Sequence, residues 1–282
     1  MVKYKKHKAF KPRKISYKIP QGVSKEETEV ANMIALEFPG THVYRSDRQV
    51  LNGREIDIYI PSKKVGFEFD GLYFHSANDK TPGYHLGKTL GCEKRGVRLV
   101  HIFSDEWELK KPLVIDLIKR VLGKKTLIDI KDCRILPITK AEGKTFLDRC
   151  CLLGDDPRAT DYLGIFYETS LISVMSFTKE KEGTRIFRYC EMRTIEVKDG
   201  IKALTKDMTS PIIYYADRRF EDGWNFKEAG FLPERADPPK VYYTRDFKSR
   251  ILSDLSRMTE SQAEKSGYTK VYDCGDLVYI RK

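Results

Sequence analysis

Four acidic side chains alternate with apolar ones along the stretch REIDIYIPSKKVGFEFDGLYFH at residues 54–75. The acids are Glu55, Asp57, Glu68 and Asp70. The period of two predicts two short strands joined by a tight turn. Ile56, Ile58 and Ile60 are expected to line the apolar face of the first strand, opposite the acids. Carboxylate oxygens gathered on one face are suited to a hard divalent cation, so the pattern indicates metal chemistry.

The turn decides which acids face each other. If the four residues Pro-Ser-Lys-Lys form the loop, Ile60 pairs with Val65 and the acids fall into two opposed pairs. These pairs are Asp57 with Glu68 and Glu55 with Asp70. Opposed like charges destabilise a strand pair, so this face needs a counter-charge, most naturally Mg²⁺ or Mn²⁺. The alternative is a hairpin with a solvated acidic face.

The same residues carry a resemblance to a known class of enzymes. Asp57 followed by Glu68-x-Asp70 resembles the core motif of the PD-(D/E)xK nucleases, with Asp70 at the usual lysine position. The run FEFDGLYFH is similar to a stretch of the very-short-patch repair endonucleases, and more closely to the EDxHD group of bacteriophage homing endonucleases. Gly71 and His75 match, whereas Asp70 replaces a histidine of the repair enzymes. The resemblance implies a nuclease core of a mixed sheet flanked by helices.

The resemblance also implies a set of metal ligands. Asp57 and Glu68 would bind Mg²⁺ or Mn²⁺, and Asp70 or an acid of the first predicted helix would complete the oxygen shell. That helix begins with the sequence Ser-Lys-Glu-Glu, in which Glu27 is the best match. Glu27 could equally close a capping box, and Glu29 is the alternative acid. We expect no small-molecule cofactor.

Two further side chains would take part in the chemistry. His75 would act as general base or as the acid for the leaving group, and a buried structural histidine is the alternative. Lys88 lies three residues after His85 on a predicted helix over residues 84–95, so the two share a face. Lys88 would supply the cation that the motif lacks at position 70, near the scissile phosphate. An ordinary surface lysine is the alternative.

The net charge of +11 is concentrated at the N-terminus. Residues 1–19 hold eight Lys or Arg and no acid, whereas bases and acids nearly balance in the remainder. A run of like charge at a terminus is typical of arms that bind nucleic-acid phosphates, and a solubilising tail is the alternative. The DNA-binding candidates in this basic tail are Lys5, Lys6, Lys8, Lys11, Arg13 and Lys14.

The composition is that of a soluble globular protein long enough, at 282 residues, for two domains. No apolar run has the length of a membrane span, and the Lys-rich start lacks the apolar segment of a signal peptide. We therefore expect the protein in the cytoplasm, of the host cell if a phage encodes it. The six cysteines form no CxxC pair, which favours reduced thiols over a zinc site.

The order of predicted elements divides the chain into two α/β domains. Residues 20–123 read as helix, strands, helix, strand and helix, which predicts the nuclease domain. A charged linker at 124–132 leads to a second domain at 133–282. Its strands and helices, with Gly-Phe after the last helix and Val241–Thr244 as the final strand, resemble the GCN5-related acetyltransferase fold.

The second domain lacks the signal for acetyl-CoA. The loop from Val197 to Lys202 has neither the first residue nor the glycine pattern that cradles a pyrophosphate. We expect a non-acetylating domain that contacts DNA, although each of its candidates, taken alone, is an ordinary surface charge. The candidates are Arg188, Arg193, Arg218 and Arg219.

Taken together, the sequence predicts a metal-dependent DNA endonuclease of the very-short-patch-repair-like branch, of the phage homing type or a nickase. Its partner would be double-stranded DNA, bound by a monomer or homodimer. Two alternatives stay open. One is a DNA-modifying acyltransferase that uses the second domain, and the other is a DNA-binding regulator with an inactive nuclease core.

Overall fold

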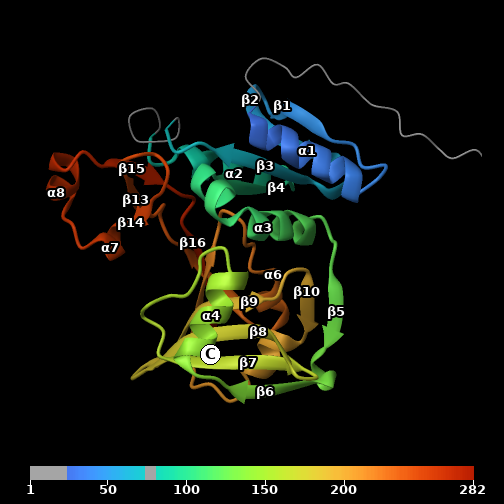
Figure 1. Cartoon of the computed structure of the whole chain (residues 1–282), viewed down its shortest axis with the longest axis vertical. Helices are drawn as coiled ribbons and strands as arrows, with labels where there is room; N and C mark the ends of the chain where they lie inside the picture. Colours follow the sequence, from blue (N-terminus) through green and yellow to red (C-terminus); the bar gives the residue numbers. More distant parts are fainter. Residues whose placement is uncertain (1–23, 74–80) are drawn as a thin grey trace, which may run out of the picture.

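The structure, a computed structural model, describes residues 24–73 and 81–282. It is a mixed α/β protein made of two units that pack against each other through helix α3 (Figure 1). Among the described residues, no helix combines the length and the apolar character needed to cross a membrane. The first unit contains α1 (Lys25–Glu37), β1 (Tyr44–Leu51), β2 (Arg54–Ile60), β3 (Val65–Asp70), α2 (Tyr84–Glu93), β4 (Arg98–Phe103) and α3 (Ser104–Val121).

A four-stranded sheet in the order β1-β2-β3-β4 is the centre of the first unit. Strands β1 to β3 are antiparallel, and β4 lies parallel to β3. Ile60 pairs with Val65 across a short 3-10 turn, and Ile58 pairs with Phe67. The predicted hairpin register is therefore confirmed next to the turn, from Ile60–Val65 to Ile58–Phe67, and the ladder does not continue to the two predicted acid pairs. Lys64 closes the turn with a φ of 51°, which lets the chain reverse within four residues.

Helices cover both faces of this sheet. Ile58 lies in the apolar cluster formed with α1 and α3, whereas Ile56 lies in a separate cluster with α2. The prediction that the isoleucines share one face was therefore wrong for Ile56. The alternation breaks at Asp57, because the ladder between β2 and β3 ends at Ile58 and the Asp57 carboxylate accepts a 2.7 Å hydrogen bond from the backbone N–H of Phe69. That carboxylate replaces a main-chain partner at the end of the hairpin.

The second unit is built on a seven-stranded sheet in the order β12-β16-β11-β9-β8-β7-β6. Every neighbouring pair is antiparallel except β9 and β11, which run parallel, pair only from Ile212 to Tyr214 and then diverge. This unit contains β6 (Cys133–Pro137), α4 (Lys140–Cys150), β7 (Asp161–Tyr167), β8 (Ser170–Glu180), β9 (Gly183–Glu191), α5 (Gly200–Leu204), β11 (Ile212–Asp217), α6 (Trp224–Glu228), β12 (Leu232–Ala236) and β16 (Asp276–Arg281).

Two small sheets complete the chain and correct two expectations. The segment 124–132 contains β5 (Thr126–Asp129), which pairs in parallel with β10 (Ile195–Lys198), so it is not a free spacer. The expected final strand, β13 (Val241–Thr244), lies outside the large sheet and pairs with β14 (Ile251–Leu252) and β15 (Thr269–Tyr272). Strand β12 follows Gly-Phe directly and takes the edge of the large sheet instead. The short helices α7 (Ser253–Ser256) and α8 (Glu260–Lys265) flank this three-stranded sheet.

The two units share both apolar and ionic contacts. Leu152 and Phe220 of the second unit belong to the apolar cluster of the first. The guanidinium of Arg219 is fully buried and forms ion pairs with Glu106 at the start of α3 (2.7 Å) and with Asp217 (3.0 Å). Because a buried charge is tolerated only when it is paired, these contacts hold the units in one arrangement.

Candidate functional site

Three predicted residues meet between the sheet and α2. Lys88 of α2 forms a buried ion pair with Glu68 of β3. Asp57, at the end of the β2–β3 pairing, lies close enough for its charge to raise the pKa of Glu68. Asp57 directly follows the last paired residues of the hairpin, and its carboxylate accepts from the backbone N–H of Phe69, the residue next to Glu68. We call Asp57, Glu68 and Lys88 the acidic cluster.

Burial and repulsion from neighbouring carboxylates raise the pKa values of the two acids in the acidic cluster. Burial raises the pKa of Asp57 to about 7, and the charge of Glu27 adds to the rise. Burial and then the charge of Asp57 hold the pKa of Glu68 well above its ordinary value. Burial alone would lower the pKa of Lys88, but the Glu68 carboxylate raises it above its ordinary value. One lysine therefore leaves the buried acids undercompensated.

One oxygen of the acidic cluster has an unused hydrogen-bonding capacity. Oε2 of Glu68 accepts from Lys88, while Oε1 is buried and has no hydrogen-bond partner among residues 24–73 and 81–282. A buried acceptor without a partner is costly. Oε1 of Glu68 therefore marks a position where a bound cation would be stabilised.

Glu27 forms the predicted capping box and also lies near Asp57, and its predicted role at a metal stays a prediction. Its carboxylate accepts from the backbone N–H of Ser24 at 3.0 Å, and the Ser24 hydroxyl accepts from the N–H of Glu27 at 3.1 Å, which is a complete capping box. Glu27 is also buried, and its charge is felt at Asp57. Glu29 instead pairs with Lys111 and takes no part in the acidic cluster.

Asp70 faces a different set of side chains. Its Oδ2 lies 2.8 Å from Nδ1 of His101 on β4, and its Oδ1 lies 3.3 Å from Nδ1 of His85 on α2. All three side chains are buried, and their possible ligand atoms lie within 4.8 Å of one another. Burial lowers the pKa of His101, and the Asp70 carboxylate opposes that change. We call Asp70, His85 and His101 the histidine cluster.

Helix α2 positions one member of each cluster. His85, Lys88 and Thr89 are buried at spacings of three and four residues, so they form one face of the helix against β3 and β4. A buried helix face made of polar residues is unusual, and here each of them has a polar neighbour on the sheet. The predicted shared face of His85 and Lys88 is confirmed.

Other predicted site residues lie elsewhere. Glu55 is partly exposed and pairs with Arg48, so it does not form the second acidic pair with Asp70 that the register suggested. His75 and the basic tail, including its six Lys and Arg candidates, lie outside the described residues. Their predicted roles stay predictions.

Three of the four candidate DNA contacts in the second unit, Arg188, Arg218 and Arg219, have protein partners. Arg219 is buried in the ionic interface between the units, which corrects its expected role as a DNA contact. Arg218 pairs with Glu93 of α2. Arg188 donates to the carbonyl of Gly154 at 3.1 Å. Arg193, with a φ of 49°, lines a cavity between the units. These contacts favour structural roles over phosphate binding.

His101 and Thr89 were not among the site residues predicted from the sequence. A signal for His101 was available, because it is the one polar side chain in the otherwise apolar core of the strand RLVHIF. Parallel pairing of β3 with β4 places His101 opposite Glu68 in register, and its ring then reaches Asp70. The pairing of β3 with β4 joins segments that are distant in the sequence, so the periodicity of either strand does not predict it.

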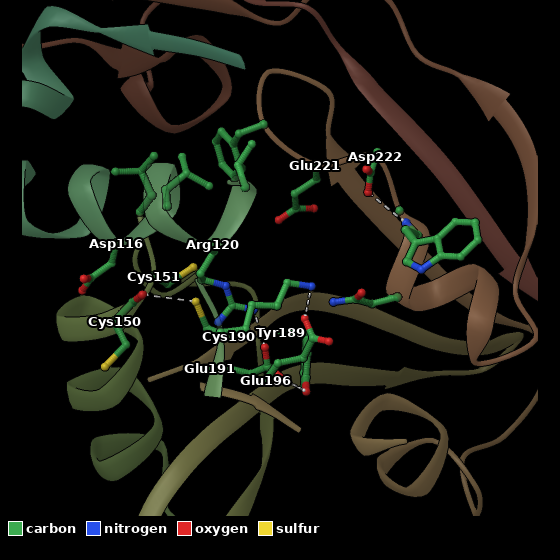
Figure 2. Close-up of a pocket in the computed structure, with 18 of the residues that line it drawn as sticks. Asp116, Arg120, Cys150, Cys151, Tyr189, Cys190, Glu191, Glu196, Glu221 and Asp222 are labelled. Carbon is green, nitrogen blue, oxygen red and sulfur yellow. Dashed lines mark hydrogen bonds and ion pairs between the residues drawn. The ribbon is translucent and has the colours of Figure 1, made fainter. Parts of the chain in front are cut away.

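A cavity of about 280 Å³ lies between α3 and the second unit (Figure 2). It opens where β9 and β11 diverge, and Figure 2 shows Glu221, Tyr189 and the thiols of Cys151 and Cys190 around it. Burial raises the pKa of Glu221 to about 8, although the Tyr214 hydroxyl donates to it at 2.6 Å. This space was not anticipated from the sequence.

The chain matches no protein-family model, and no curated protein is significantly similar to it.

Proposed function

We propose that this chain is a metal-dependent DNA endonuclease with a PD-(D/E)xK-type core, followed by a domain of the GCN5-related acetyltransferase type. The observation that carries the proposal is the acidic cluster. Asp57 and Glu68 are brought together beside Lys88 in a buried, negatively charged site. The motif from which the resemblance was drawn contains two acids and a cation, and α2 supplies a lysine where the strand has Asp70.

The acidic cluster fits a hard divalent cation. Its donors are carboxylate oxygens, the ligand type that Mg²⁺ and Mn²⁺ prefer. The raised pKa values of Asp57 and Glu68 and the unpartnered Oε1 of Glu68 all describe a site that lacks positive charge. When bound, such an ion polarises a phosphate and lowers the pKa of a water ligand.

The chain's own side chains would do the rest. Asp57 and Glu68 hold the ion, and the ammonium of Lys88 stabilises charge that develops on the phosphate. Glu27 adds negative charge beside Asp57 while its carboxylate fixes the start of α1. His75 is the proposed general base or leaving-group acid. The basic tail would bind the backbone of double-stranded DNA in a salt-dependent manner.

The sheet orders support both halves of the fold assignment. The first unit combines an antiparallel hairpin with a parallel fourth strand, and helices cover both faces. The second unit has one parallel pair, β9 and β11, which pair only from Ile212 to Tyr214, and Gly-Phe follows its helix α6 as the resemblance implies. Its helix α5 is only five residues long and follows the altered loop at 197–200. This favours a domain that has no acetyl-CoA chemistry.

A cleavage assay tests the proposal. Supercoiled plasmid and phage genomic DNA would be incubated with wild type in Mg²⁺, Mn²⁺ or EDTA, and with Asp57→Asn and Glu68→Gln. We expect nicking or linearisation that requires the metal, and a loss of about 100-fold or more in either variant. Glu55→Gln is the matched control, because Glu55 lies on the same strand and pairs at the surface with Arg48. It should cleave like wild type.

Two results would overturn the proposal. Wild type that binds DNA but cleaves none of these substrates in either metal would favour the inactive regulator. Metal-dependent cleavage that survives in both Asp57→Asn and Glu68→Gln would mean that the acidic cluster is not the catalytic site.

The cavity between the units favours one second candidate, an acyltransferase that modifies DNA or a nucleotide. It lies at the fork of β9 and β11, and Glu221 has a pKa of about 8, which suits a general base. Native mass spectrometry and calorimetry with acetyl-CoA test this candidate. Stoichiometric binding that Glu221→Gln leaves intact, together with acyl transfer that it abolishes, would establish the second activity. Absence of binding would exclude it.

A further inference from the structure

Asp70, His85 and His101 form a compact cluster beside the acidic cluster. The Asp70 carboxylate lies between the two imidazoles, with one oxygen 2.8 Å from Nδ1 of His101 and the other 3.3 Å from Nδ1 of His85. The two rings are edge to face, with centroids 5.4 Å apart. Each residue comes from a different element, β3, α2 or β4, so the sheet and the helix hold the three ligand atoms together.

Thr89 sets the tautomer of His101. Its Oγ1 lies 3.2 Å from the carbonyl of His85, the usual hydrogen bond of a threonine to the preceding helical turn. A hydroxyl has only one hydrogen, so Oγ1 acts as the acceptor for Nε2–H of His101 at 3.0 Å. It is also the acceptor for the thiol of Cys274 from the second unit, at 3.4 Å. All hydrogen-bonding capacities of Thr89 are then used.

This arrangement leaves a lone pair on Nδ1 of His101. A neutral imidazole carries one N–H, and Thr89 takes it at Nε2. The lone pair of Nδ1 then points at a carboxylate oxygen of Asp70 only 2.8 Å away. Two lone pairs at that distance repel each other unless a cation lies against both. The ion can be a metal or a proton, and the second imidazole at Asp70 favours a metal.

We propose that Asp70, His85 and His101 bind a transition-metal dication of the Zn²⁺ class. Two imidazole nitrogens and one carboxylate form the ligand set of many open zinc sites, which keep a further position for water or substrate. Mg²⁺ strongly prefers all-oxygen ligands, so it belongs to the acidic cluster instead. Metal-binding histidines commonly donate their other N–H to a fixed partner, and Thr89 is that partner for His101.

The proposal goes beyond the nuclease function and does not depend on it. The nuclease requires an ion on Asp57 and Glu68, whereas this site has its own ligands two residues further along β3. A spectroscopic readout therefore separates the two, because it is independent of DNA cleavage.

Cobalt is the probe for this site. The full-length chain without an affinity tag would be stripped with EDTA and titrated with Co²⁺, with visible absorption and calorimetry as readouts. We expect one Co²⁺ per chain with the intense visible bands of a low-coordinate site, displaced by Zn²⁺ and retained in excess Mg²⁺. His85→Gln and His101→Gln should each abolish the bands. His42→Gln, at an exposed histidine, should retain them. Asp57→Asn and Glu68→Gln should retain them too.

A variant outside the ligand set guards against a folding artefact. Thr89→Val has nearly the same shape and keeps all three ligands, and it should weaken Co²⁺ binding by about 10- to 100-fold. Circular dichroism in EDTA would establish that each variant is folded. Absence of a stoichiometric Co²⁺ site in wild type would overturn the proposal, and the cluster would then be held by a proton. Bands unchanged in both His85→Gln and His101→Gln would overturn it as well.

Discussion

Replacing Asp57 by Asn is expected to stabilise the metal-free protein at alkaline pH, although it removes a proposed metal ligand. Burial raises the pKa of Asp57 from an ordinary 3.8 to about 7. Between these values the folded protein keeps a proton that the unfolded chain has released, so the free energy of unfolding falls as the pH rises. Asn retains an oxygen that can accept from the N–H of Phe69 and has no charge to bury.

The pKa difference sets the size of the effect. One pKa unit is worth about 1.4 kcal/mol, so the rise from 3.8 to about 7 gives a ceiling of about 4 kcal/mol above neutral pH. Asp57 keeps some contact with solvent, which reduces the cost of its charge. We expect a gain of about 2 kcal/mol, or roughly 4–8 °C in melting temperature for a chain of this size.

The stability difference between Asp57→Asn and wild type would be measured by thermal and urea unfolding at pH 5 and pH 8, in EDTA and in Mg²⁺. In EDTA the Asp57→Asn variant should exceed wild type at pH 8 and differ less at pH 5. In Mg²⁺ the difference should shrink or reverse, because the ion stabilises only the chain that binds it. Glu55→Gln should follow wild type throughout. A variant that is less stable than wild type at pH 8 in EDTA would refute the argument from buried charge.

Three further predictions concern the interface, the site lysine and the tail. Arg219→Met should lower the free energy of unfolding by about 3–5 kcal/mol, because Glu106 and Asp217 lose a buried partner. Urea unfolding measures this loss. If the loss were no larger than that of Arg235→Met, at an exposed arginine, the prediction would be contradicted. Lys88→Met should slow cleavage about 10²- to 10³-fold, measured on supercoiled plasmid, while Lys94→Met on the exposed end of the same helix should cleave normally. Deleting residues 1–19 should reduce the slope of log affinity for DNA against log salt concentration by up to about 7. Fluorescence anisotropy on duplex DNA measures this slope. An unchanged slope would show that the tail binds no phosphate.

Much of the acidic cluster could be predicted because it depends on local geometry. A four-residue turn fixes the register of a hairpin from Ile60–Val65 to Ile58–Phe67, and Asp57 and Glu68 are the residues that follow these pairs on the two strands. The spacing of His85 and Lys88 likewise gives a shared helix face without reference to the rest of the chain. The capping box at Glu27 is local too. Each of these features is determined within a few residues of sequence.

Other assignments depended on contacts between distant segments. Glu55 and Asp70 were expected to face each other. Instead Glu55 forms an ion pair with Arg48 of the neighbouring strand, and the Asp70 carboxylate contacts two histidines. Arg219 looked like a surface cation until the packing of the two units buried it against Glu106. In each case the partner lies in another helix or strand. Periodicity describes only residues within one element, so it cannot predict such a contact.

The sequence by itself determined the mixed α/β class, the central hairpin with its register next to the turn, and the face of α2 that carries His85 and Lys88. Only the tertiary structure decided that these residues divide into an oxygen-rich cluster and a histidine cluster, because His101 reaches Asp70 through the parallel pairing of β3 with β4. Alternation and helical spacing are properties of one element. The burial of apolar surface over the whole chain decides which elements become neighbours. The side chains that form each cluster are therefore determined by the tertiary structure.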